Sequence, residues 1–161
     1  LLGLISGMLI HQKGTINIAK EKLGYIGPTP LILSTTLKEN LLYGNKLKIT
    51  DKKIIETCEL FNLDEEINED YLNRQVTNTS LSSGQMQKVG FIRAILSNVE
   101  ILLLDESTSN LDRNTKSLIL NILTKNNITV VNSTHDPTSF QKVDRHLQID
   151  IIDNNRKVYD V

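Results

Sequence analysis

Two short stretches of the chain carry residue types that suit nucleotide chemistry. Leu81 to Gln85 reads Leu-Ser-Ser-Gly-Gln and opens a predicted helix, where free backbone N–H groups and the helix dipole favour an anion. The apolar run Ile101 to Leu104 ends in Asp105 and Glu106, so two carboxylates stand at the rim of a buried strand. The first stretch suits a phosphate, and the second suits a metal ion and a water. Together they predict nucleotide hydrolysis.

The two carboxylates predict different roles. Asp105, at the carboxyl end of its strand, is placed to hold Mg²⁺ through water, as acidic residues do in phosphate sites. Glu106 is one residue further and points elsewhere, where it can polarise an attacking water as a general base. The alternative is structural, because an Asp-Glu pair also caps a following helix at its electropositive start.

Three further polar groups have both a chemical and a structural interpretation. Ser82, Ser83 and Gly84 can hold a γ-phosphate at a helix N-terminus, or one of the serines is an ordinary N-cap. His135 follows a predicted strand and can contact a phosphate or orient a water, or it is a polar loop residue. The turn from Ser109 to Asp112 lies near the acidic pair, or its Asp caps the next helix.

The composition narrows the class of protein. The chain has 161 residues, enough for one domain with a core. A net charge of −1 gives no global attraction to nucleic acid, and 4% aromatic residues without Trp provide no base-stacking platform. The single cysteine, Cys58, excludes an intrachain disulfide and fits a reducing compartment. No apolar run reaches the ~18 to 20 residues of a membrane span, and the apolar start predicts a core helix rather than a signal peptide.

The elements that position these residues follow from hydrophobic periodicity and from turn signals. Strands and helices alternate, which favours an α/β fold with a parallel sheet. The segment from about 37 to 96 is rich in predicted helix and forms a candidate lobe of its own, the remainder being the α/β core. The expected helices cover 1–11, 36–43, 51–61 with Thr50 as N-cap, a stretch from Ser83, and a stretch around 118–123. The expected strands cover 15–18, 23–26, 101–104 and 128–131, and a terminal hairpin covers 145–152 and 157–161. We expect a loop at 27–30 and surface helix and loop at 62–80.

Taken together, the order and spacing of these motifs resemble the nucleotide-binding domain of ATP-binding cassette (ABC) proteins. Ile101 to Asp105 resembles the Walker B strand of that family, Glu106 its catalytic carboxylate and His135 its switch histidine. The resemblance covers the chain from 1 to 161 as a single domain and implies a P-loop NTPase-like α/β fold, with a parallel-sheet core plus a helical subdomain. It identifies the residues of two loops, the signature loop with Leu81, Ser82, Ser83, Gly84 and Gln85, and the D-loop with Ser109, Asn110, Leu111 and Asp112.

The resemblance implies a mechanism and partners. Two such domains, alike or different, pair head to tail and hold ATP and Mg²⁺ between them. The signature loop then serves the nucleotide of the partner, while Asp105, Glu106 and His135 serve the nucleotide on their own side. The stretch from Thr36 to Gly44 resembles the region of exporter-type domains that meets the transmembrane domain. We therefore expect an ATPase at the cytoplasmic face of a membrane, held there by a transmembrane domain outside this chain.

Three departures from the family pattern limit this expectation. The sequence contains no Gly-x-x-x-x-Gly-Lys-Ser/Thr, the loop that cradles the α- and β-phosphates, and Leu1-Leu2 resembles the residues that follow it. Pro28 stands where the family has the Q-loop glutamine, with Thr29 as a weaker substitute oxygen, and Ser83 replaces the first glycine of the signature loop. We expect an N-terminally truncated domain that is inactive alone; the alternative is natural loss, giving a non-hydrolysing module that completes the ATP site of a partner.

Overall fold

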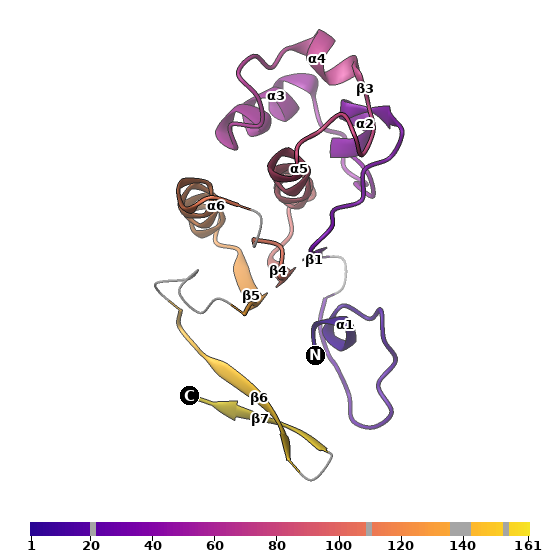
Figure 1. Cartoon of the computed structure of the whole chain (residues 1–161). Coiled ribbons are helices and arrows are strands. Elements are labelled where there is room, and N and C mark those ends of the chain that lie inside the picture. The colour runs from indigo at the N-terminus through magenta and orange to yellow at the C-terminus, as the bar shows by residue number, and fades with distance from the viewer. Residues whose placement is uncertain (20–21, 109–110, 136–142, 153–154) are drawn as a thin grey trace.

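A parallel sheet of three strands forms the centre of the computed structural model, which describes residues 1–19, 22–108, 111–135, 143–152 and 155–161 (Figure 1). The strands are β1 (Leu23–Ile26), β4 (Ile101–Asp105) and β5 (Thr129–Ser133), in the order β1-β4-β5. The register pairs Leu23 with Ile101 and Asp105 with Ser133, and both ladders are parallel. The predicted α/β class with a parallel sheet is therefore confirmed, and the carboxyl ends of all three strands meet at one edge.

Burial across this sheet is uneven. Leu102, Leu103 and Leu104 in the central strand β4 are completely buried, as the uninterrupted apolar run predicts. The expected strand at 128–131 exists as β5, but its residues are half-buried or exposed rather than buried. The reason is position, because β5 is an edge strand of the described sheet and has a neighbour on one side.

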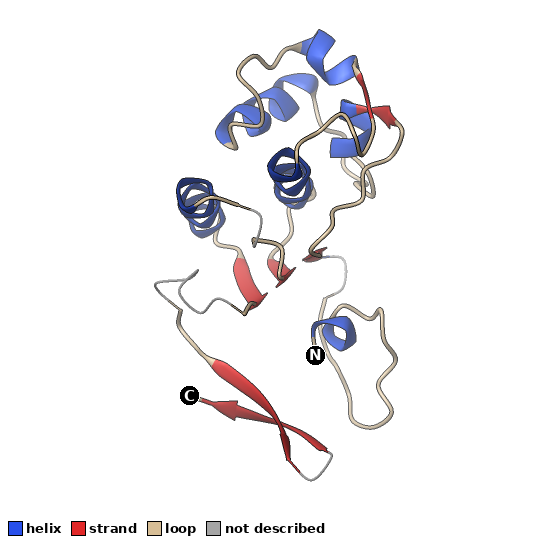
Figure 2. Cartoon of the chain, in the orientation of Figure 1, coloured by secondary structure: helices blue, strands red, loops and turns tan. Residues whose placement is uncertain are grey.

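Two long helices, α5 (Ser83–Leu96) and α6 (Arg113–Lys125), lie on one side of the sheet, with the N-terminal segment and the terminal hairpin on the other (Figure 2). The shorter helices α2 (Leu37–Leu41), α3 (Asp51–Leu60) and α4 (Glu69–Asn73) contact one another, and α2 and α3 also contact α5. The strands β2 (Thr35–Thr36) and β3 (Gln75–Val76) form an antiparallel pair beside them. Phe61, after α3, stacks on Phe91 of α5 with ring centroids 6.5 Å apart, so apolar packing joins the small helices to the long one.

Side-chain caps explain where most of these helices begin. Thr36 caps α2 and Ser82 caps α5, each in a reciprocal capping box with the residue three positions on. Thr50 caps α3 as predicted, with its hydroxyl accepting from the Lys53 N–H, and Asp112 caps α6. The expected helices at 36–43, 51–61, from Ser83 and around 118–123 are confirmed, each with slightly shifted ends, and α4 and β3 lie in the segment expected to be surface helix and loop.

The N-terminal predictions are wrong. The helix expected at 1–11 is reduced to α1 (Leu2–Ile5), and no strand forms at 15–18. Gly7 has φ of +78°, which ends the helical turn, and the Leu9 N–H donates to the Gly3 carbonyl at 2.8 Å. Met8, Leu9 and Ile10 are 59%, 60% and 93% exposed, so the described chain gives this apolar stripe nothing to bury against. A short helix without such tertiary support is marginal.

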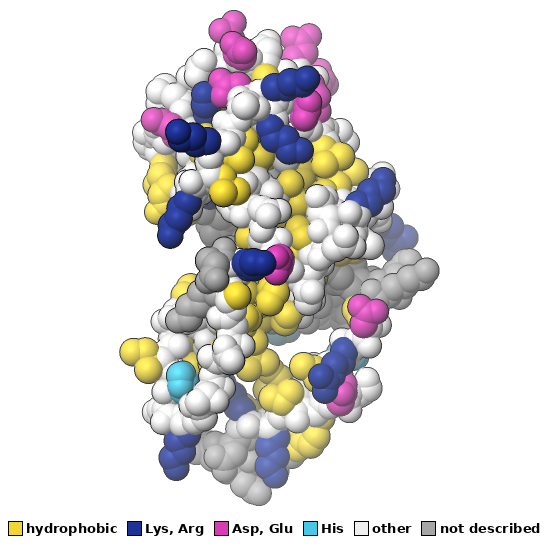
Figure 3. Space-filling model, turned by 180° about the vertical axis from the view of Figure 1, so that it is seen from behind, with side chains coloured by type: hydrophobic (Ala, Val, Ile, Leu, Met, Phe, Trp, Pro, Cys, Tyr) yellow, Lys and Arg dark blue, Asp and Glu magenta, His cyan; other side chains and the backbone are white. Residues whose placement is uncertain are grey.

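The terminal hairpin is confirmed. Strands β6 (Leu147–Ile152) and β7 (Asn155–Asp160) pair antiparallel, with Ile149 opposite Val158, while the predicted turn residue 154 lies outside the described residues. Ile149, Ile151 and Val158 are exposed, and hydrophobic side chains reach the surface in this lower part of the molecule (Figure 3). Among the described helices, none is long and apolar enough to cross a membrane.

The Phe61–Phe91 contact gives a first testable expectation. Phe91 is fully buried, so Phe91→Ala leaves a large cavity between α3 and α5 and should lower the free energy of unfolding by about 3 to 5 kcal/mol. Urea unfolding followed by circular dichroism measures this change. Leu60→Ala is the control, because Leu60 is the exposed last residue of α3, next to Phe61. This substitution should change the free energy of unfolding by less than about 1 kcal/mol. Equal losses in the two variants would contradict the expectation.

Candidate functional site

The carboxyl edge of the sheet brings three predicted site residues together. The register of β4 and β5 sets Asp105 beside Ser133, and the backbone N–H of Glu106 donates to the Ser133 carbonyl at 2.9 Å. His135 follows two residues later, and its Nε2 lies 3.0 Å from Oε1 of Glu106. The side chain of Glu106 is 46% exposed and that of His135 is 90% exposed, so the pair is open to solvent and to a ligand.

The structure excludes the helix-capping interpretation of the acidic pair. Helix α6 begins at Arg113 and is capped by Asp112, whose Oδ1 accepts from the N–H groups of Asn114 and Thr115 at 2.9 and 3.0 Å. Asp105 and Glu106 therefore do not cap that helix. Asp105 is the last residue of the buried strand β4 and Glu106 follows it, at the edge where the neighbouring strand β5 also ends.

Glu106 has an unusual backbone conformation. Its φ is +51°, in the left-handed region that costs L-residues free energy. The other described non-glycine residues with positive φ are Asn62, Asn98 and Asn127, which follow the ends of α3, α5 and α6 and are of a type that tolerates this region. Glu106 lacks that tolerance. The neighbouring strand holds it there through the Ser133 carbonyl, and strain of this kind occurs at functional sites.

Sequence reasoning missed Tyr25, which contacts Asp105. The Tyr25 hydroxyl donates a hydrogen bond to Oδ2 of Asp105 at 2.8 Å. Burial and the hydrogen bond to the Asp105 carboxylate, together with its charge, raise the pKa of Tyr25 above its ordinary value. The two residues are 80 positions apart in sequence, and only the strand register reveals that they share a face of the sheet.

The signature loop is a capped and accessible helix start. Ser82 is the N-cap of α5: its Oγ accepts from the Gln85 N–H at 3.2 Å, and its own N–H donates to Gln85 Oε1 at 2.9 Å. Leu81 is buried, whereas Ser82 and Ser83 are exposed. A Cβ added at Gly84 would meet no atom of the described residues within 4 Å, apart from the backbone of its own helix, so there is room beside this helix start. The N-cap interpretation of Ser82 is confirmed, and it is compatible with an anion at the same helix end.

The loop after β1 contains the two residues predicted at the Q-loop position, Pro28 and Thr29. Pro28 and Thr29 are exposed at the same edge as Asp105, and neither side chain makes a hydrogen bond in the described part of the chain. The Pro28 carbonyl accepts from Nε2 of Gln87 at 2.8 Å, so the loop is tied to helix α5. Gln87 is buried, and its Oε1 has no hydrogen-bond partner among the described residues.

Of the D-loop, Ser109 and Asn110 lie outside the described residues. Leu111 is buried, and Asp112 is the cap described above. The hydrogen bond from the Thr115 hydroxyl and those from nearby backbone N–H groups lower the pKa of Asp112. The capping alternative for Asp112 is therefore confirmed.

A second group that sequence reasoning missed joins α2 to α5. Asn40 is completely buried; its Nδ2 donates to the carbonyls of Leu33 and Thr36 at 2.9 and 3.0 Å, and its Oδ1 accepts from the Leu33 N–H at 2.8 Å. Arg93 of α5 donates to the Asn40 carbonyl at 2.5 Å and to the Leu31 carbonyl at 2.6 Å. Desolvation lowers the pKa of Arg93. The sequence signal was present, since Arg93 interrupts the apolar run from Phe91 to Leu96.

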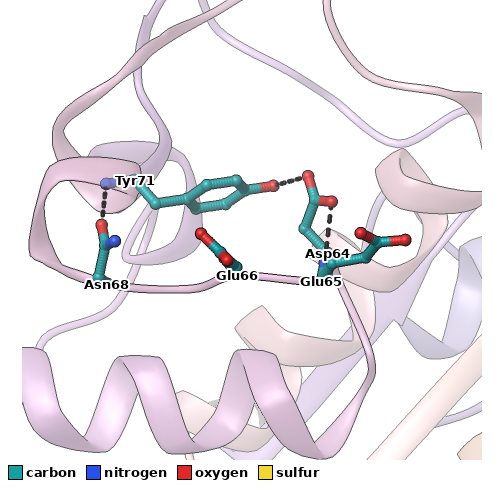
Figure 4. Close-up of a pocket in the computed structure, with 5 residues that line it drawn as sticks. All are labelled: Asp64, Glu65, Glu66, Asn68 and Tyr71. Carbon is teal, nitrogen blue, oxygen red and sulfur yellow. Dashed lines mark hydrogen bonds between the residues drawn. The ribbon is translucent and has the colours of Figure 1, made fainter.

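A surface hollow of about 410 Å³ lies elsewhere, at the acidic turn between α3 and α4 (Figure 4). It is lined by Asp64, Glu65, Glu66, Asn68 and Tyr71. Its main polar groups are used within the fold, because Tyr71 donates from its hydroxyl to Asp64 and from its N–H to Asn68 Oδ1. The hydrogen bond from Tyr71 lowers the pKa of Asp64. Since neither Asp105 nor Glu106 lines this hollow, it is separate from the edge of the sheet that carries them.

Comparison with known proteins identifies the family. The family model described as ABC transporter matches residues 1–109, more than half of the chain. The chain belongs to the ABC transporter family. It is 35% identical over 163 residues to the Mesentericin-Y105 transport/processing ATP-binding protein MesD of Leuconostoc mesenteroides, a match that covers 91% of this chain and 23% of MesD. It is 31% identical over 135 residues to the transport/processing ATP-binding protein ComA of Streptococcus pneumoniae, covering 81% of this chain and 19% of ComA.

A solved structure supports the fold of this ABC transporter domain. The structure of a bacterial Atm1-family ABC exporter with ATP bound matches with a TM-score of 0.69 and 21% sequence identity, over 80% of this chain and 23% of that chain. The chain thus spans about a fifth to a quarter of the length of these relatives. The resemblance to the ATP-binding domain of exporter-type ABC proteins is confirmed, as is its α/β fold.

The positive φ of Glu106 predicts a difference in folding stability between two variants that both lack its carboxylate. Glu106→Gly should be about 1 kcal/mol more stable than Glu106→Ala, because only alanine keeps the cost of φ of +51°. Chemical denaturation of both proteins measures the difference. Glu100 is the control position, because it is exposed and has no positive φ. There the alanine variant should be as stable as the glycine variant or more stable. Equal stability of the two Glu106 variants would contradict the strain.

The hydrogen bonds of the buried Asn40 side chain predict a large loss of folding stability when this residue is replaced. Asn40→Ala leaves the Leu33 N–H without its partner and removes the side-chain hydrogen bonds to the Leu33 and Thr36 carbonyls, so it should destabilise the protein by about 2 to 4 kcal/mol. Thermal unfolding measures the loss. Asn73→Ala at the exposed end of α4 is the control and should stay within about 0.5 kcal/mol of wild type. A cost at Asn40 as small as that of the control would show that the network contributes little.

Proposed function

We propose that this chain is the ATP-binding part of an ABC exporter and that it couples ATP binding and hydrolysis to transport. The observation that carries the proposal is the Glu106–His135 contact of 3.0 Å beside Asp105, at the carboxyl edge of a parallel sheet. Ligands of open α/β folds bind at this edge.

The residues at the edge fit a magnesium ion that arrives with a nucleotide. Asp105 supplies a carboxylate oxygen, the hard ligand that Mg²⁺ prefers, and one of its two oxygens makes no hydrogen bond among the described residues. No cluster of three or more acidic, His or Cys side chains able to hold a metal exists in the described part of the chain. This donor set suits Mg²⁺ held by one carboxylate, water and phosphate oxygens. When bound, Mg²⁺ would offset the negative charge of the phosphates.

The proposed chemistry uses two side chains. Glu106 accepts a proton from the attacking water as the general base. The His135 imidazole lies 3.0 Å from the Glu106 carboxylate, where it would help to orient that carboxylate toward the water. The strained backbone of Glu106 supports the assignment, because strain is retained where position matters.

The signature loop is proposed to act on a different nucleotide. The N–H groups of the first turn of α5 and the Ser82 hydroxyl would contact a phosphate bound to a second ABC domain, with Gly84 leaving room for it. The contacts of Ser82 and Gln85 are with each other and with residues 63–64, separate from those of Asp105 and Glu106. We retain the division into a helical lobe at about 37–96 and an α/β core as part of this proposal.

The attachment to a transmembrane domain is likewise proposed. Tyr43 is an exposed side chain within the stretch that resembles the exporter contact region, and Leu31 and Leu47 are exposed apolar side chains on either side of it in the sequence. They would dock against a transmembrane domain and hold this chain at the cytoplasmic face of a membrane. The buried Asn40–Arg93 group stiffens the backbone beneath them.

A second candidate function has its own supporting observation. The sequence contains no Gly-x-x-x-x-Gly-Lys-Ser/Thr, and Pro28 has no side-chain donor or acceptor. A domain of this kind would complete the ATP site of a partner through Ser82 and Gly84 and hydrolyse nothing on its own side. The DNA upstream of Leu1 separates the two candidates: a reading frame that encodes a phosphate-binding loop favours the ATPase.

The test uses the protein expressed from its complete reading frame. Glu106→Gln should reduce the ATPase rate by about 10² to 10⁴-fold while retaining ATP binding, because it removes only the base. Gly84→Ala should leave thermal stability equal or slightly raised, since its Cβ meets no protein atom, but should reduce ATPase by tenfold or more in the dimer. ATPase rates, ATP binding by calorimetry and melting temperature are measured for each.

The outcomes discriminate. Turnover of Glu106→Gln at the wild-type rate would remove Glu106 from the role of base. Loss of activity in Gly84→Ala but not in Glu106→Gln would favour the module that completes the site of a partner. The isolated 161-residue chain should bind Mg-ATP more weakly than micromolar, and micromolar affinity by calorimetry would contradict the need for a separate phosphate-binding loop.

A further inference from the structure

We propose that Tyr25 is a positioning residue that holds the Asp105 carboxylate in the orientation needed to bind the metal ion of the nucleotide. The contact is the 2.8 Å hydrogen bond from the Tyr25 hydroxyl to Asp105 Oδ2. The inference rests on the proposed function, because it assigns a role to Tyr25 only where Asp105 serves a divalent cation.

The backbone explains why this tyrosine reaches Asp105. Tyr25 pairs with Leu103 in the parallel ladder of β1 and β4, and Asp105 lies two residues beyond Leu103 on the same face of the sheet. The ring extends toward the carboxyl edge along Gly27: a Cβ at Gly27 would lie 3.4 Å from Tyr25 Cε1 and 3.7 Å from its hydroxyl. The length of the tyrosine side chain thus bridges the two-residue offset between the paired strands.

The chemistry suits an orienting group. The Tyr25 phenol is an uncharged O–H donor, so it holds the Asp105 carboxylate through a hydrogen bond without adding a second negative charge beside it. Among the described residues, Oδ2 is the one oxygen of Asp105 that takes part in a side-chain hydrogen bond, which leaves Oδ1 for a metal ion or for its bound water. Hydrogen bonds to the far oxygen of a ligating carboxylate fix its orientation, and their loss costs about 10 to 100-fold in metal affinity or activity.

Other candidates for this role fail on chemistry. Pro28, in the loop that follows β1, has neither a donor nor an acceptor in its side chain. Tyr25 makes the only hydrogen bond to the Asp105 carboxylate found among the described residues. Asp105 would therefore depend on Tyr25 for its orientation.

The experiment compares Tyr25→Phe with a matched tyrosine. Tyr159→Phe is the control, because Tyr159 is 39% exposed against 38% for Tyr25 and its hydroxyl makes no hydrogen bond in the described part of the chain. Both variants, wild type and Asp105→Asn are made in the protein expressed from its complete reading frame. Binding of Mn²⁺, as a paramagnetic substitute for Mg²⁺, is titrated by electron paramagnetic resonance at saturating ATP, and melting temperature is recorded as a check on folding.

We expect Tyr25→Phe to weaken Mn²⁺ binding by about tenfold and Tyr159→Phe to leave it unchanged, with melting temperatures close to wild type. The Mg²⁺ concentration for half-maximal ATPase should rise by a similar factor, while the rate at saturating Mg²⁺ stays within about twofold. A purely structural role would lower that saturating rate instead.

Two results would overturn the inference, and they are distinguishable. Weaker Mn²⁺ binding in Asp105→Asn but not in Tyr25→Phe would refute the role of Tyr25 and leave the proposed function standing. Unchanged Mn²⁺ binding in both variants would refute the metal role of Asp105 as well, and with it the proposed site.

Discussion

The parallel pairing of β4 with β1 and β5 is the constraint on which the rest of the site depends. It brings the ends of three strands to one edge, although Tyr25, Asp105 and Ser133 are far apart in sequence. The register alone sets Glu106 against the Ser133 carbonyl and His135 against Glu106. A slip of one residue would turn the side chains of β4 to the opposite face and separate these groups. Such a slip would move the half-buried Asp105 toward the position of Leu104, which is completely buried, and the cost of burying a carboxylate opposes it.

The sequence predicted those elements of the structure that are determined by residues close together in the chain. Thr36, Thr50 and Ser82 begin helices because their side chains reach N–H groups two or three residues away, and such caps are readable without tertiary knowledge. The uninterrupted leucines of β4 and the acidic pair after them were likewise readable. Family resemblance then linked Glu106 with His135, and the structure brings these two residues into contact.

What the sequence did not reveal depends on partners distant in the chain. The apolar start favours a helix only where another surface buries it, and the described chain buries Leu2 alone from that stripe. The Tyr25–Asp105 contact depends on strand register, and the buried role of Asn40 depends on Arg93, 53 positions later. A polar residue in a helix reads as exposed until its partners are known, so Asn40 escaped prediction.

The hydrogen bonds that attach α5 to the loop after β1 affect how the position of this helix can change. Arg93 anchors the far end of this helix to the loop after β1, and Gln87 adds a second hydrogen bond to that loop, while the opposite end of the helix carries Ser83. At 1.5 Å per residue, Ser83 lies roughly 15 Å along the axis from Arg93. A tilt of about 5° at the anchored end would therefore move the signature loop by about 1.3 Å, given that lever length. Such a displacement makes or breaks a hydrogen bond to a phosphate, so α5 can act as a lever that converts a small shift of one loop into contact at another.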